Sequence, residues 1–167
     1  MIYGLTLAGA IHSALALTSI AVGLIQLRRR KGGAPHRARG YAYVCATLIA
    51  DGAAMLIYQF TGRFNIFHVG AVVNLVTIAA GMVPLLQIPR PPNWMLRHYY
   101  CMSWSYVGLL AAALSEFVVR STYLASREQV WIVTAATTMV VTAIGYVLIE
   151  RHRPASDSQP IQHEVVR

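Results

Sequence analysis

Residues 64–88 read FNIFHVGAVVNLVTIAAGMVPLLQI and contain no aspartate, glutamate, lysine or arginine. A helix of about 20 residues is long enough to cross the ~30 Å hydrocarbon core of a bilayer. Because lipid offers no partners to open backbone groups, a stretch this apolar is expected to cross as a closed helix. The stretch therefore predicts a membrane protein, with lipid as the solvent around its helices.

Four further stretches of similar length carry almost no charge. They are Met1–Leu27, Gly40–Thr61, His98–Val119 and Gln129–Ile149. Together with residues 64–88 they predict an all-α integral membrane bundle of five transmembrane helices. We expect residues 1–150 to form this domain and residues 151–167 to form a short disordered cytoplasmic tail, because the sequence turns polar after the last stretch.

Charge predicts the orientation. Only 12% of the 167 residues are charged, about half the fraction in a soluble domain. The net charge of +8 comes from basic residues at segment ends, which favours contact with anionic membrane lipids over nucleic acid. Of the 14 lysines and arginines, eleven fall in the connections and tail on one side, and Arg63, Arg120 and Arg127 fall on the other. The N-terminus is therefore expected outside and the C-terminus in the cytoplasm.

Asp51 is the most informative polar residue, because a carboxylate near the middle of a membrane needs a partner or takes up a proton. A rise of ~1.5 Å per residue places both Asp51 and His12 roughly 15 Å below the outer surface, on neighbouring antiparallel helices. Asn74 falls at a similar depth. The pair is interpreted either as a metal ligand or proton acceptor, or as a structural hydrogen bond that fixes helix register.

Two shallower residues extend this group. His68 and Glu116 lie roughly 6–8 Å below the outer surface. His68 is interpreted either as a ligand or as an interfacial histidine in contact with water. Glu116 precedes Arg120 by one helical turn, so the two are expected to pair with each other.

Two cofactor models are consistent with these depths. The first is a site for zinc or iron with mixed nitrogen and oxygen ligands, formed by His12, Asp51, His68 and Glu116. The second binds haem b at one histidine pair near each face, with His12 and His68 outside and His36 and His98 inside. The unequal depth of the outer pair counts against the second model.

Three short motifs carry a family resemblance. His36-Arg37-Ala38-Arg39-Gly40 has the form H-R-x-x-G, Phe67-His68 opens the third helix, and residues 98–106 give H-x-x-x-M-x-x-S-Y. In this order and spacing they resemble a bacterial family of polytopic membrane proteins of unknown function, over roughly Ala10–Arg120. The resemblance implies a multi-pass protein of the bacterial cytoplasmic (inner) membrane whose histidines are candidates for metal or redox chemistry.

The sequence contains no phosphate-cradling glycine loop, zinc-protease motif or nucleophile elbow, and it leaves open whether the protein is an enzyme. We expect it to bind a metal or haem within its bundle for redox chemistry or transport. One alternative is an accessory subunit of a larger membrane complex, or a homo-oligomer, with no chemistry of its own. A second alternative is a proton-coupled small-molecule carrier that uses Asp51.

Overall fold

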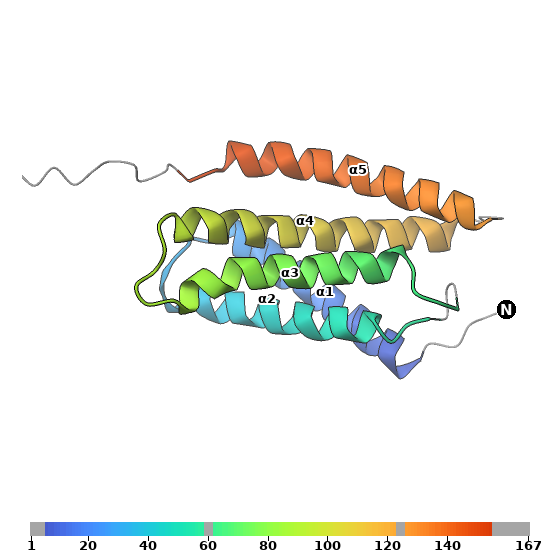
Figure 1. Cartoon of the computed structure of the whole chain (residues 1–167), viewed down its shortest axis with the longest axis horizontal. Coiled ribbons are helices and arrows are strands. Elements are labelled where there is room, and N and C mark those ends of the chain that lie inside the picture. Colours follow the sequence, from blue (N-terminus) through green and yellow to red (C-terminus); the bar gives the residue numbers. More distant parts are fainter. Residues whose placement is uncertain (1–5, 59–61, 123–125, 155–167) are drawn as a thin grey trace, which may run out of the picture.

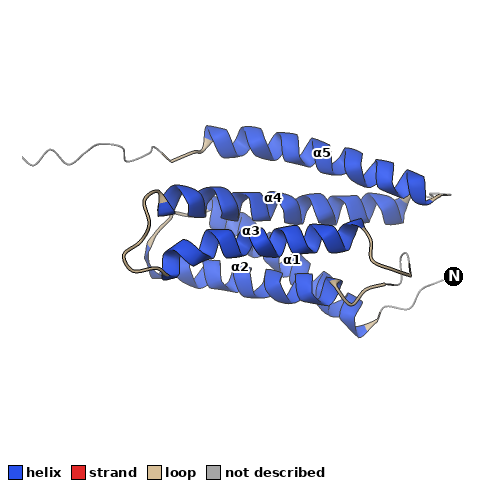
Figure 2. Ribbon diagram, viewed as in Figure 1, coloured by secondary structure: helices blue, strands red, loops and turns tan. Residues whose placement is uncertain are grey.

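The structure is a computed structural model that describes residues 6–58, 62–122 and 126–154, apart from the side chain of Arg127. Within these residues the chain forms five α-helices (Figure 1). They are α1 (Leu7–Arg28), α2 (Gly33–Ala54), α3 (Ile66–Leu86), α4 (Trp94–Ser121) and α5 (Arg127–Arg151). Figure 2 shows them joined by loops alone wherever the connection is described.

Four of the described helices, α1, α3, α4 and α5, are long and apolar enough to cross a membrane. α2 has the same length as α1, but His36, Arg37 and Arg39 lie near its start and Asp51 near its end, which lowers its hydropathy. The predicted all-helical architecture is thus confirmed for the described residues. Four of the five predicted crossings have the length and hydropathy that a crossing requires.

Helices α1 to α4 form a ring in which each helix packs against two neighbours. α1 contacts α2 and α4, and α3 contacts the same two helices. α1 therefore lies diagonally opposite α3, and α2 lies diagonally opposite α4. α5 packs chiefly against α4, at the edge of the bundle, and the start of α1 and the end of α5 lie at opposite ends (Figure 1).

The middle of the ring is a packed apolar layer formed by Tyr43, Val44, Ile78, Tyr106 and Leu109. The hydroxyl groups of Tyr43 and Ser105 lie 2.9 Å apart and form a buried hydrogen bond between α2 and α4. A Cβ atom at Gly23 would lie 2.5 Å from the ring of Tyr106. A glycine there lets α1 approach the two tyrosines closely, as small residues do at helix contacts in membranes.

The helix bounds differ from those predicted. α2 runs over Gly33–Ala54 and not over Gly40–Thr61, because a glycine turn with φ of +86° at Gly32 and +73° at Gly33 leads directly into it. Pro35 is tolerated in the first turn of a helix, where no backbone donor is needed. α4 begins at Trp94 rather than at His98, shortly after the three prolines at positions 89, 91 and 92. Residues 1–5 of the first predicted helix and residues 155–167 of the predicted tail lie outside the described residues.

Candidate functional site

The six residues predicted to carry chemistry divide between the two ends of the bundle. Helices α1 and α3 start at one end and α2 and α4 at the other, because successive helices are antiparallel (Figure 1). Near the first end lie His12, Asp51, His68 and Glu116. Near the second end lie His36 and His98. The predicted grouping by depth is therefore kept by the fold.

Asp51 pairs with Asn74. The Nδ2 group of Asn74 donates to Oδ2 of Asp51 over 2.9 Å, and both residues are buried, at 6% and 8% exposure. The Oδ1 atom of Asn74 is buried without a partner. The depth prediction placed these two residues together correctly, but the expected direct bond between Asp51 and His12 is replaced by this bond between α2 and α3.

His12 bridges three helices instead. Its Nδ1 lies 2.9 Å from the carbonyl oxygen of Ala50, which can only accept, so Nδ1 carries the proton. Its Nε2 faces Oε2 of Glu116 on α4 at 3.8 Å. Glu116 is also held by Arg120, at 2.6 Å from Oε1 to Nη2 and 2.9 Å from Oε1 to Nε. The predicted pair of Glu116 with Arg120 is confirmed, and it competes with His12 for the same carboxylate.

His68 is buried, at 2% exposure, so its interpretation as a histidine in contact with water is wrong. The backbone N–H of Asn65 donates to its Nδ1 over 3.2 Å, which caps the start of α3. The rings of Tyr58 and Phe64 lie on it, each with a centroid 5.0 Å away. The connection before α3 therefore buries this side chain, and its Nε2 has no partner.

At the other end, His36 is held by a residue that sequence reasoning passed over. The Nε2 group of Gln26, near the end of α1, donates to Nδ1 of His36 over 2.7 Å, and its Oε1 accepts from Arg39 over 3.0 Å. The same Nε2 group lies 2.9 Å from the carbonyl oxygen of His36, so Gln26 holds both the ring and the backbone of this residue. A polar residue in the last turns of an apolar helix was the signal that could have identified Gln26.

His98 lies on α4 near His36. Its Nδ1 is 3.0 Å from the carbonyl oxygen of Gly81 on α3, so Nδ1 donates and Nε2 keeps a free lone pair in the neutral ring. A Cβ at Gly81 would lie 2.8 Å from Cβ of Cys101, so α3 and α4 are in close contact beside this bond. His98 is thus fixed in the orientation that metal-binding histidines usually adopt, with one nitrogen bonded to a carbonyl group.

Among the described residues, no three histidine, cysteine, aspartate or glutamate side chains gather closely enough to hold a metal ion. His12 faces Glu116, Asp51 is bonded to Asn74, and His68 stands apart between aromatic rings. The mixed site of four ligands therefore stays a prediction. Each of the four helices of the ring does carry one of the candidate histidines.

Most of the chain matches one family of known proteins. Residues 9–150 match a family described as predicted membrane protein (DUF2306). The chain belongs to this family. No curated protein matches the chain, and no solved structure matches it.

The DUF2306 match extends beyond the three motifs noted in the sequence, because it includes α5 and ends one residue before the last residue of that helix. All six candidate residues lie within it. The family is described as membrane proteins, in agreement with the four helices that are apolar enough to cross a bilayer. Its description names no activity, so the function of this DUF2306 protein has to be argued from the arrangement of its side chains.

Proposed function

We propose that this protein is a transmembrane electron carrier that binds haem b between diagonally opposed histidines, at one or both ends of its four-helix ring. The observation that carries the proposal is the distribution of four histidines, one on each helix of the ring. His12 on α1 and His68 on α3 form one diagonal pair, and His36 on α2 and His98 on α4 form the other. Histidine ligands on facing helices are a common way to hold a cofactor inside a helical bundle.

The positions of His12 and His68 along their helices support the haem model better than the depths predicted from the sequence. Because α1 begins at Leu7, His12 lies about 8 Å from the start of its helix, and His68 lies about 3 Å from the start of α3. The expected depth mismatch is therefore smaller than a count from Met1 suggests. The buried Nε2 of His68 has no hydrogen-bond partner among the described residues, and a bound ligand would account for this.

The four histidine side chains differ in their hydrogen bonds. His12 and His98 donate from Nδ1 to backbone carbonyl groups, so Nε2 is the atom that would bind iron; in His12 it would first have to leave Glu116, which it faces at 3.8 Å. His36 and His68 accept at Nδ1, so binding iron through Nε2 requires them to give up those bonds. Each diagonal pair therefore contains one histidine that donates from Nδ1 and one that accepts at Nδ1. Bound haem would supply one-electron chemistry, and the chain would supply the ligands and a low-dielectric surrounding.

The orientation belongs to the same proposal. We take all five helices to cross the inner membrane of a bacterium, with the N-terminus outside and the C-terminus in the cytoplasm. The support is the eleven basic residues in the connections and tail on one side against three on the other. The His36 and His98 pair would then lie at the cytoplasmic face, and the His12 and His68 pair at the outer face.

The test is an absorption spectrum and elemental analysis of the full-length protein, purified in a mild detergent from cells supplied with haem precursor. We expect a Soret band that sharpens on reduction, and the loss of the haem at one end when a histidine of that end's pair is changed to alanine. His152→Ala is the matched control, because His152 is exposed and lies beyond the ring at the end of α5.

Three other outcomes would favour or exclude the other functions. Zinc or non-haem iron without a Soret band, lost on His12→Ala, would support the mixed metal site. Protein that carries neither metal nor chromophore would overturn both cofactor models. Co-purification with a larger membrane complex, together with full tolerance of Asp51→Asn, would then support the accessory subunit.

A further inference from the structure

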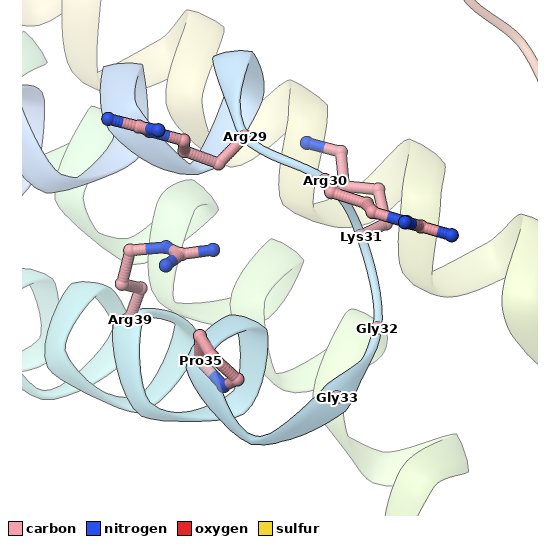
Figure 3. Close-up of a pocket in the computed structure, with 7 residues that line it drawn as sticks. All are labelled: Arg29, Arg30, Lys31, Gly32, Gly33, Pro35 and Arg39. Atoms are coloured by element: carbon pink, nitrogen blue, oxygen red, sulfur yellow. The ribbon is translucent and has the colours of Figure 1, made fainter.

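A basic pocket lies at the turn between α1 and α2, next to Gln26 and His36. It has a volume of about 500 Å³ and is lined by Arg29, Arg30, Lys31 and Arg39, with Gly32 and Gly33 at its edge. In Figure 3, Arg29 at the end of α1 and Arg39 on α2 stand on opposite sides of the opening, and Arg30 and Lys31 lie on the turn between them. The lining contains four cations and no acid.

Few of these charges are neutralised by the protein. The first 50 residues of the chain contain no aspartate or glutamate. Within the described residues, Arg29 and Arg30 form no ion pair. Lys31 donates to the carbonyl groups of Gln26 and Leu27, at the end of α1 where the helix dipole is negative. A bound anion would complete the charge balance that the chain itself leaves open.

Lys31 lies close to another cation of the pocket, Arg39. Burial lowers the pKa of the Lys31 ammonium below its ordinary value, and the positive charge of Arg39 lowers it further. The start of α2 adds unused donors, because its N-cap residue Gly32 has no side chain to accept from the first turn. Backbone donors at a helix start and arginine side chains both suit the oxygens of a phosphate group.

The position of the pocket favours a lipid as the source of that phosphate. The turn follows directly on the last turns of α1, where Leu24, Ile25 and Leu27 are exposed at 39%, 46% and 47%. Apolar side chains exposed on a membrane-spanning helix face acyl chains. A lipid lying along the end of α1 would therefore bring its headgroup to the level of Arg29 and Arg30.

We propose that the pocket lined by Arg29, Arg30, Lys31 and Arg39 is a binding site for the phosphate group of an anionic membrane lipid. The proposal does not rest on the binding of haem. Arg39 also donates to Gln26, the partner of His36, so the test changes Arg29 and Arg30 and leaves Arg39 in place. The loss of two of these cations is expected to weaken binding about thirtyfold.

The experiment measures lipid binding to the purified full-length protein in a neutral detergent, by native mass spectrometry and by titration. The probes are phosphatidylglycerol and phosphatidylcholine with the same acyl chains, and glycerol 3-phosphate and inorganic phosphate as soluble sources. The variant is Arg29→Gln with Arg30→Gln. The matched control is Arg28→Gln with Arg37→Gln, which removes the same charge from exposed residues that do not line the pocket.

We expect phosphatidylglycerol to bind more tightly than phosphatidylcholine, and the pocket variant alone to weaken it. Soluble phosphates that bind with the same dependence on Arg29 and Arg30 would support the phosphate site and assign it a soluble ligand. Equal weakening by both double variants, or equal binding of the two lipids, would overturn the proposal in favour of diffuse attraction by the basic surface.

The double glutamine variant could disturb insertion into the membrane, because basic residues beside a helix also affect its orientation. A second variant avoids this problem. Arg29→Lys with Arg30→Lys keeps the charge but loses the planar fork that binds two phosphate oxygens at once. Binding of phosphatidylglycerol is expected to weaken severalfold in this variant. An unchanged affinity in a correctly inserted lysine pair would overturn the site.

Discussion

The bond between Asp51 and Asn74 should be the most costly single polar contact to remove from the end of the bundle at which α1 and α3 begin. Asn74→Ala leaves the carboxylate of Asp51 buried without its donor. A hydrogen bond to a charged group contributes about 1.5–3 kcal/mol in soluble proteins. Bonds between transmembrane helices contribute less, about 0.6 kcal/mol on average and up to about 1.7 kcal/mol.

Two features of this site decide between these magnitudes. The acceptor is a carboxylate with 6% exposure, which favours the upper end of the membrane range. The substitution also removes Oδ1 of Asn74, a buried acceptor without a partner among the described residues. Its removal offsets part of the lost free energy of unfolding. We expect Asn74→Ala to lower the free energy of unfolding by about 1–2 kcal/mol.

The assay is a double-mutant cycle of Asp51→Ala and Asn74→Ala, measured by unfolding in mixed micelles and followed by circular dichroism. The coupling energy is expected to be about 1–1.5 kcal/mol. The exchange variant, Asp51→Asn with Asn74→Asp, rebuilds the bond in the reverse direction and should recover most of the loss. Thr77→Ala on the same helix is the control, because Thr77 bonds only to a carbonyl group of its own helix. A coupling energy near zero, or no recovery by exchange, would refute the reasoning.

Three further predictions test other parts of the bundle. Gly145→Val should loosen α5 from α4 by about 1–3 kcal/mol, because its Cβ would lie 2.6 Å from Val107, whereas Gly108→Val meets nothing within 4 Å and should be neutral; detergent unfolding compares them. Glu116→Gln should cost less than about 1 kcal/mol in the same assay, because this carboxylate is 35% exposed. Gln26→Ala should lower stability by about 1–2 kcal/mol in the same assay, because it removes the donor to His36 and the acceptor of Arg39.

The sequence predicted the helices well, because a charge-free length near 20 residues is a property of the chain alone. It predicted their ends less well. The second crossing was predicted over Gly40–Thr61, whereas α2 ends at Ala54 and α3 begins at Ile66. Tyr58 and Phe64 in the connection between these helices cover His68, and hydropathy contains no information about such long-range ring contacts.

The candidate residues show which part of a site can be obtained from sequence. Depth along a helix follows from residue number, so Asp51 and Asn74 were correctly placed at one level. The direction in which each side chain points depends on how the helices are rotated and packed, and this decided that His12 faces Ala50 and Glu116. Gln26 was missed for the same reason, because only the packing of α1 against α2 brings it to His36.

The packing also predicts that the two ends of the bundle act independently. His12 is bonded to Ala50, and His36 lies 14 residues earlier on the same helix, so the two ends are about 21 Å apart along α2. Between them Tyr43 and Tyr106 are in contact, with ring centroids 6.4 Å apart, within the packed apolar layer. Sites this far apart with no shared partners have additive effects, within about 0.5 kcal/mol. A double change of His12 and His98 should therefore lower stability, and any bound haem, by the sum of the two single changes. A clear excess over that sum would mean that the apolar middle transmits strain between the two ends.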